Sequence, residues 1–195
     1  MKKLLISLLL FAYVFTFAQE KLIKDIDFDG VKDTVYLDLE KAVIVCKLST
    51  QNFKKTESKP IEILNAMSGI VDAKNGFVFF NDWMRAGYKN QFRYNKKLKK
   101  IQLIGMSRYE FGTATGNGSG ESSVNLLTHD YIGNWNYYDN FANNEKGELV
   151  KIPTIKTKMK FQPITLETFG EDIYFEFSER CSKLYYSHKE KMKSK

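Results

Sequence analysis

The sequence has few of the residues that mark an enzyme active site or a junction between domains. Its 195 residues include only two histidines, two cysteines and three prolines. The histidines, His129 and His188, belong to neither a G-x-S-x-G nucleophile motif nor an H-E-x-x-H zinc motif. No Pro-rich or Ser-rich linker, repeat or low-complexity block divides the chain. These absences favour a single domain and predict that the protein is not an enzyme.

The chain begins with an apolar segment that is too short for a membrane span. Two lysines precede an apolar run at residues 4–17, and Thr16 and Ala18 stand at positions −3 and −1 of a cleavage site. The run is shorter than the roughly 20 residues that cross a bilayer, and no cysteine stands at the cut to carry a lipid anchor. Residues 1–18 therefore predict a cleaved signal peptide. Residues 19–195 are the predicted exported domain, periplasmic or extracellular, with no membrane span.

The chain is basic, with a formal charge of +7 that loss of the leader lowers by two. An exported basic protein meets cell-wall polymers, anionic glycans and acidic proteins rather than nucleic acid. Its lysines gather at residues 95–100, predicted to be a hairpin tip, and at residues 188–195, predicted to be a frayed end. We therefore expect no nucleic-acid partner.

Short runs of β-branched and aromatic residues, separated by Gly, Asn and Asp, indicate an all-β, mostly antiparallel domain. Residues 91–95 and 100–106 flank a Lys-rich turn, which is typical of a hairpin. Only residues 164–169 have the pattern of a helical turn. Strands at this spacing fit a sandwich, a barrel or a propeller-like arrangement. The predicted strands are residues 34–39, 42–48, 76–82, 91–95, 100–106, 123–128, 132–138, 152–159 and 172–177.

The two cysteines, Cys46 and Cys181, lie near opposite ends of the domain. In an oxidising compartment they can form one long-range disulfide, which stabilises the fold chiefly by constraining the unfolded chain. Buried free thiols are the alternative. Both alternatives stand at the level of the sequence.

Four aspartates surround one glycine in the segment DIDFDGVKDTVYLDL. Asp25, Asp27, Asp29 and Asp33 occupy positions 1, 3, 5 and 9 of a calcium-binding loop, and the carbonyl of Val31 occupies position 7. Carboxylates so close together repel one another unless a cation neutralises them. Position 12 is a tyrosine rather than the glutamate of an EF-hand, and a strand-like run follows. The segment predicts a structural Ca²⁺ ion in a short DxDxDGxxD loop, with a solvated acidic turn as the alternative.

A second segment, RYEFGTATGNGSGESS, is rich in glycine and joins two predicted strands. It has no Lys-Ser/Thr pair and no following helix, so it is not a phosphate-binding loop. Glu121 at its end suits insertion into the cleft of a protein partner. Asn117, Ser119 and Glu121 therefore form the predicted partner-binding loop, with a plain hairpin connection as the alternative.

An aromatic run follows, in which Trp135, Tyr137 and Tyr138 alternate with asparagines. One face of such a strand can stack on sugar rings, although core packing is the commoner use of these residues. A cell-surface glycan is therefore the alternative partner to a protein.

Several of these segments together resemble a group of exported calcium-loop β proteins. The group is related to the immunity proteins of bacterial type IV secretion effectors. The likeness covers residues 24–138, and the aspartate loop is its specific part. The segments are the leader, DIDFDGVKDTV, QFRYNKKLKKIQLIG, the glycine-rich loop and SVNLLTHDYIGNWN.

The resemblance implies a β-propeller-like fold and a calcium ion held by Asp25, Asp27, Asp29, Asp33 and the carbonyl of Val31. It also implies inhibition of lysozyme-like peptidoglycan hydrolases. In the inhibitory members a surface loop has a glycine four residues before a glutamate, where this chain has an asparagine before its glutamate. The expected function is an exported calcium-binding inhibitor or immunity protein. The alternative is a calcium-stabilised module that binds a cell-surface glycan or protein.

Overall fold

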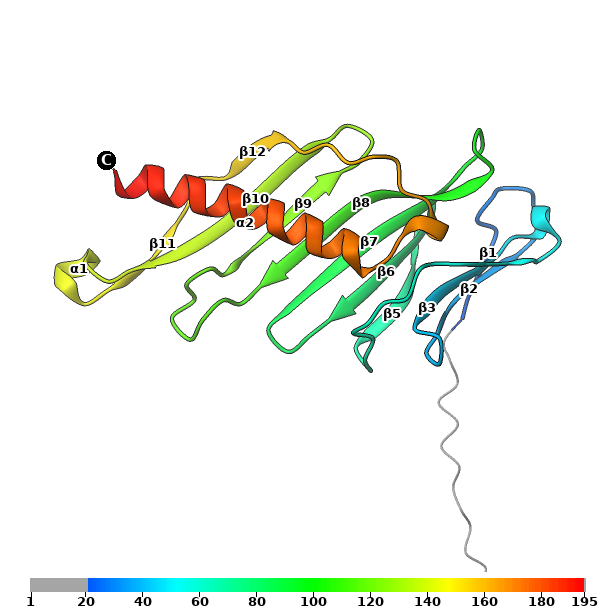
Figure 1. Ribbon diagram of the computed structural model, residues 1–195, viewed down its shortest axis with the longest axis horizontal. Coiled ribbons are helices and arrows are strands. Elements are labelled where there is room, and N and C mark those ends of the chain that lie inside the picture. Colours follow the sequence, from blue (N-terminus) through cyan, green and yellow to red (C-terminus); the bar gives the residue numbers. More distant parts are fainter. Residues whose placement is uncertain (1–20, 195) are drawn as a thin grey trace, which may run out of the picture.

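The structure, a computed structural model, describes residues 21–194, so the predicted signal peptide at residues 1–18 lies outside the described residues. The described chain forms two open sheets and one long helix that crosses one face of the larger sheet (Figure 1). All paired strands are antiparallel. The predicted, mostly antiparallel β fold is confirmed, as open sheets rather than a closed barrel or the radial blades of a propeller.

The smaller sheet has four strands in chain order. Side chains alternate between buried and half-buried along β2, whereas β3 is buried almost throughout, as expected of a central strand rich in valine and isoleucine. A short 3-10 turn, η1 (Ser49–Gln51), follows β3. The strands are β1 (Leu22–Lys24), β2 (Asp33–Asp38), β3 (Val43–Lys47) and β4 (Lys55–Glu57).

The larger sheet has eight strands, in the order β11-β10-β9-β8-β7-β6-β5, and β11 and β12 pair with successive parts of β10. β7 and β8 form the predicted hairpin. Two short turns, α1 (Ala142–Glu145) and η2 (Leu166–Thr168), join later elements, and η2 confirms the predicted helical turn. The strands are β5 (Ser68–Ala73), β6 (Gly76–Asp82), β7 (Ala86–Asn95), β8 (Lys100–Glu110), β9 (Gly120–Asn125), β10 (Asp130–Asp139), β11 (Glu148–Lys151) and β12 (Ile155–Lys158).

The C-terminal part of the chain is helical, so the predictions of a strand at residues 172–177 and of a frayed basic tail were wrong. Helix α2 spans Glu171–Lys193. Its buried aromatic and thiol residues recur every three or four positions, which is the period of a helix face. Acidic residues in the first turn and lysines in the last turn also favour the helix through its dipole. The buried stripe consists of Tyr174, Phe177, Cys181 and Tyr185.

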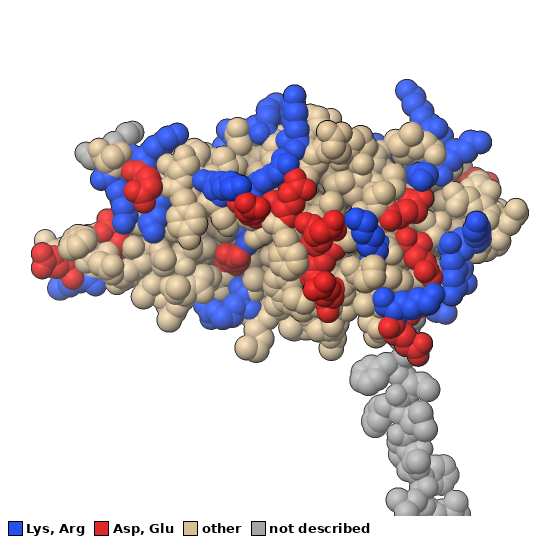
Figure 2. Space-filling model, viewed as in Figure 1, with Lys and Arg blue, Asp and Glu red and all other residues tan. Residues whose placement is uncertain are grey.

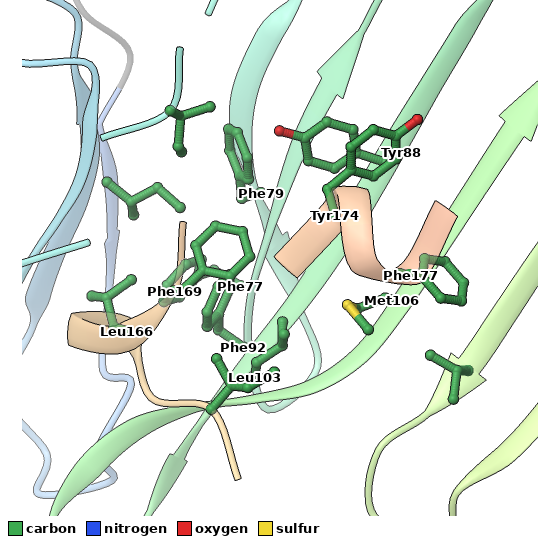
Figure 3. Close-up of a cluster of buried hydrophobic side chains, with 14 of the residues drawn as sticks. Phe77, Phe79, Tyr88, Phe92, Leu103, Met106, Leu166, Phe169, Tyr174 and Phe177 are labelled. Carbon is green, nitrogen blue, oxygen red and sulfur yellow. The ribbon is translucent and has the colours of Figure 1, made fainter. Parts of the chain in front are cut away.

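Helix α2 closes the core by packing aromatic rings against the larger sheet (Figure 3). Tyr174 of α2 stacks on Tyr88 of β7 with ring centroids 4.1 Å apart. Phe79 and Phe92 both meet the ring of Phe169 edge-on, just before the helix begins. These rings are fully or almost fully buried and belong to one continuous core that includes the inner residues of the smaller sheet. The two sheets therefore form a single domain.

Both cysteines are buried and free. Cys46 lies in β3, and Cys181 lies in α2 with its sulfur 3.3 Å from the hydroxyl of Ser122. Burial raises the pKa of both thiols, which keeps them protonated. Of the two alternatives, the structure has buried free thiols, which act here as small core residues.

The surface of the described residues carries mixed charge. Acidic and basic side chains are interspersed on the face that Figure 2 shows, and neither sign forms a continuous patch there. None of the described helices is both long and apolar enough to cross a membrane.

Two phenylalanines on α2 test its packing. Phe177 is fully buried, whereas Phe175 is 50% exposed on the opposite side of the helix. We expect Phe177→Ala to lower the free energy of unfolding by about 3–5 kcal/mol, because it leaves a cavity between helix and sheet. Phe175→Ala is expected to change it by less than about 1 kcal/mol. Urea denaturation of both variants measures the difference. Equal losses would contradict the helical arrangement, since in a strand both side chains would lie on one face.

Candidate metal centre and uncovered sheet face

The aspartate loop connects β1 to β2, whose ends pair at Lys24 and Asp33. Asp25 holds the loop closed, because its carboxylate accepts hydrogen bonds from three backbone N–H groups. Its Oδ1 accepts from Phe28 at 2.7 Å and Asp29 at 3.2 Å, and its Oδ2 accepts from Gly30 at 3.0 Å. Gly30 has φ +89°, a conformation that a side chain disfavours, so glycine suits this turn.

Three of the predicted ligands lie together in this loop. One carboxylate oxygen from each of Asp25, Asp27 and Asp29 lies within 4.8 Å of the others. At that separation the three negative charges repel, and a single cation between them can contact all three. The described residues therefore contain an acidic cluster that can hold a metal ion.

Asp27 is the buried member of the cluster, with 4% of its surface exposed. Its Oδ2 accepts a hydrogen bond from the hydroxyl of Thr50, but its Oδ1 is buried and has no hydrogen-bond partner. Burial and the neighbouring carboxylates raise the pKa of Asp27, and the Thr50 bond only partly offsets them. An unpartnered carboxylate oxygen inside the protein is unfavourable unless a cation or a donor reaches it.

Asp29 lies on the exposed side of the cluster. It accepts hydrogen bonds from the hydroxyl of Ser49 at 2.7 Å and from the N–H of Val31 at 2.8 Å. These two bonds lower its pKa and favour the ionised form. Val31 itself is about half exposed.

Asp33 lies outside the three-carboxylate cluster, although the sequence predicts it as a ligand. It is fully buried, and its Oδ2 accepts from the N–H groups of Ile26 at 2.7 Å and Asp27 at 3.3 Å. Its Oδ1 accepts from the N–H of Ser49 at 2.8 Å. Asp33 therefore links the loop to the start of η1, and the hydrogen bond that it accepts from the N–H of Asp27 positions the backbone of that residue.

The loop also lies beside the β7–β8 hairpin. The ammonium of Lys96 is 5.6 Å from the ring centroid of Phe28, and Gln51 of η1 donates to the carbonyl of Lys99 at 3.1 Å. The candidate metal centre thus lies where the smaller sheet meets the hairpin tip of the larger one.

The glycine-rich segment connects β8 to β9 and is held against β10 by hydrogen bonds. Its backbone exchanges hydrogen bonds with Asn136, since Gly118 donates at 3.0 Å and Ser119 accepts at 2.8 Å. The side chain of Asn117 accepts from the N–H of Tyr138, and the hydroxyl of Ser119 bonds the Asn136 amide. Two of the three residues predicted for a partner-binding loop, Asn117 and Ser119, therefore have side chains that are hydrogen-bonded to β10 of the same chain.

Glu121 lies in strand β9 rather than on a projecting loop. It pairs with Tyr109 of β8 and Asn134 of β10, so sheet hydrogen bonds fix its backbone. Its side chain is exposed on the face of the larger sheet opposite to α2, because its neighbours in β9 alternate between buried and exposed.

Trp135 and Tyr137 of the aromatic run in β10 lie in the core, whereas Tyr138 is half-buried, so Trp135 does not belong to the sugar-stacking face that the sequence offers as an alternative. Trp135 is 2% exposed, and its indole N–H donates to the hydroxyl of Tyr131. Its ring meets Tyr185 of α2 edge-on at 6.3 Å. The same alternation that exposes Glu121 turns Trp135 toward the helix.

The face of the larger sheet opposite to α2 is uncovered by any other element that the structure describes (Figure 1). Two adjoining hollows of about 260 Å³ and 340 Å³ lie on it. They share Lys89, Ser107 and Ser123, and Glu121 lines the first of them. The sequence does not predict this surface, because its residues are spread over neighbouring strands and only the alternating polar positions of β7 and β9 point to it.

No protein family, curated protein or solved structure matches the chain. The likeness to the calcium-loop immunity proteins stays a prediction.

Two glycines of the segment between β8 and β9 test its closed geometry. Gly112 and Gly118 both have positive φ, but a Cβ would come within 2.4 Å of the Asn117 carbonyl oxygen at Gly112 and meets nothing at Gly118. We expect Gly118→Ala to lower the free energy of unfolding by about 1–2 kcal/mol, from backbone strain alone. Gly112→Ala is expected to lower it by at least twice as much. Thermal melting of both variants measures this, and equal effects would contradict the closed segment.

Proposed function

We propose that this protein is an exported calcium-binding protein that acts by binding a partner at the cell wall, not by catalysis. The observation that carries the metal is Asp27, whose buried Oδ1 has no hydrogen-bond partner and whose carboxylate belongs to the acidic cluster. Export is proposed from the leader, and binding from the uncovered sheet face.

Calcium is the ion that suits this donor set best. The cluster offers only carboxylate oxygens, which hard cations prefer, and no histidine or cysteine that zinc or copper would select. Asp25, Asp27 and Asp29 would supply three ligands, and the carbonyl of Val31 and water would complete the six to eight that calcium takes. Magnesium is less suited, because it demands a near-ideal octahedron and gives up its water reluctantly.

The ion would serve the fold rather than a reaction. Two of its ligands are bonded to Ser49 and Thr50 of η1, so neutralising the cluster strengthens the contact between this loop and the rest of the smaller sheet. Because Phe28 and η1 also touch the β7–β8 hairpin, the same ion would stabilise the junction of the two sheets.

Calcium is expected to raise the thermal stability of the protein. At 100 times its Kd, a ligand of the native state adds about 2.7 kcal/mol to the free energy of unfolding. In a domain of this size, that raises the melting midpoint by roughly 5–10 °C. Melting with calcium and with chelator, together with calorimetric titration of the metal, measures the effect.

Asp27→Asn separates a metal site from a merely structural acid. The substitution removes one charge from a crowded cluster while an amide oxygen can still accept from Thr50, so the chelated variant is expected to melt no lower than the chelated native protein. Its response to calcium should be lost. Asp130→Asn, at an exposed ion pair with Lys158, is the matched control and should keep the full response. Identical midpoints with and without calcium in the native protein, and no heat of binding, would overturn the metal proposal.

Inhibition of a lysozyme-like peptidoglycan hydrolase is the partner function that the resemblance implies. Its proposed contact residue, Glu121, is exposed but lies in a hollow of a sheet face, so a partner would have to cover that face rather than receive a projecting loop. We expect micromolar protein to slow the lysis of cell walls, and Glu121→Ala to weaken the effect. Glu148→Gln, exposed on β11, is the control.

The protein concentration that gives half-inhibition distinguishes binding to the hydrolase from binding to the cell wall. If it holds the hydrolase, half-inhibition should scale with enzyme concentration at constant wall material. If it covers the wall, half-inhibition should scale with the wall material. Undiminished lysis at micromolar protein, with several lysozyme types, would remove this function and leave the calcium result unaffected.

A further inference from the structure

The hollows on the uncovered face arise from small residues in the middle of the larger sheet. Gly105 and Ser107 of β8 pair with Asn125 and Ser123 of β9. Their short side chains expose the sheet between longer neighbours, so the two hollows join into one trough that crosses β7, β8 and β9. Small residues at the centre of an otherwise exposed face allow a ligand to approach the strands closely.

The lining of the trough includes planar amide groups and hydroxyls beside its apolar side chains. Gln91 pairs with Gly105 on one side, and Asn125 lies on the other. Asn134 stands next to Glu121 across the β9–β10 pair. Amides, serine hydroxyls and a carboxylate can donate to and accept from vicinal hydroxyl groups, which is the recognition chemistry that a saccharide requires.

The charges in the trough balance. Lys89 is its exposed cation and Glu121 its anion, and the side chain of the lining Arg108 is buried and paired with Glu110. Neither a nucleic acid nor a polyanionic chain therefore finds a continuous basic track. Ile132 lines the first hollow, and Val78, Ile104, Met106, Val124 and Leu127 line the second, so the trough combines apolar side chains with its polar groups, as the apolar ring faces and hydroxyl groups of a sugar require. A neutral, hydroxyl-rich ligand matches this lining.

The aromatic ring of Tyr109 borders the trough. A Cβ at Gly87 would come within 2.8 Å of the Tyr109 ring and hydroxyl, so the absence of a side chain there lets the ring lie close to the sheet. The hydroxyl of Tyr109 donates to Asp82 at 3.1 Å, which fixes the ring further. A held ring beside amide groups is suited to the apolar face of a sugar.

We infer that this trough binds a neutral oligosaccharide strand, with Glu121 and Asn134 at one end and Gln91 and Asn125 at the other. The inference rests on the proposed binding function and names its ligand as the glycan rather than the hydrolase. A glycan laid along the trough contacts the side chains of three neighbouring strands at once, so several weak hydrogen bonds add up along its length.

Isotope-labelled protein titrated with chitotetraose and with cellotetraose tests the inference by nuclear magnetic resonance. We expect at least one of the two sugars to shift the amide resonances of β7 to β10 on the uncovered face. An oligogalacturonate of equal length is expected to bind more weakly, because the trough lacks the cations that its carboxylates need. Shifts confined to other elements, or none with either neutral sugar, would overturn the inference.

Two kinds of variant distinguish the trough from other surfaces. Glu121→Gln and Asn134→Ala remove polar groups without adding bulk, and each is expected to weaken binding by roughly threefold to tenfold. Ser123→Tyr fills the floor and should weaken it more than tenfold. Thr157→Tyr, an exposed position beside α2 on the other side of the sheet, is the matched control and should bind as the native protein does. Native affinity in a folded Ser123→Tyr variant would overturn the assignment.

The outcome is separable from the proposals above. The trough lies wholly in the larger sheet, so sugar binding at low temperature should persist in folded, chelated protein whether or not calcium stabilises it. Lysis that is slowed without any sugar binding would assign the face to a protein partner and overturn the glycan inference. Sugar binding without slowed lysis would keep the inference and remove the inhibitor function.

Discussion

The packing of α2 across one face of the larger sheet decides what the rest of the molecule can do. Tyr174 and Phe177 place aromatic rings against Tyr88 and the neighbouring strands, and burial of several such rings is the largest stabilising contribution available to a domain of this size. A sheet has two faces, and residues 21–194 contain one long helix. The strands therefore carry apolar residues toward α2 and mostly polar residues away from it, and the second face has no helix over it.

The aspartate loop stabilises a different part of the fold by a different force. The smaller sheet has only four strands and lies beside β5, the edge strand of the larger sheet. In the aspartate loop, the carboxylates of Asp25 and Asp33 accept hydrogen bonds from backbone N–H groups. Asp27, by contrast, has one buried oxygen without a hydrogen-bond partner. Without a cation, the repulsion among the carboxylates opposes this closed loop. With one, the same charges hold the loop to η1 and the hairpin tip.

The sequence predicted the elements whose pattern is local. Period-two alternation gave the strands and the β7–β8 hairpin, and the spacing of aspartates around a glycine gave the cluster. The prediction from the sequence was wrong where the same residues fit both the period of a strand and the period of a helix. In DIYFEF, Ile173, Phe175 and Phe177 alternate as in a strand, but Tyr174, Phe177 and Cys181 also follow a helical stripe. The helix prevails because the larger sheet already has a face to cover and the acidic start and basic end suit a helix.

Pairing between strands distant in the sequence determines where several candidate residues lie, and no local pattern predicts it. Asp33 fits position 9 of a calcium loop, yet it faces Ser49 because β2 and β3 bring η1 behind it. Trp135 and Glu121 both belong to segments rich in binding-type residues. The register of β9 on β10 sends the indole to the core and the carboxylate to the open face. The sequence identifies the chemistry of each residue. The face of the sheet on which that residue lies depends on the pairing between strands.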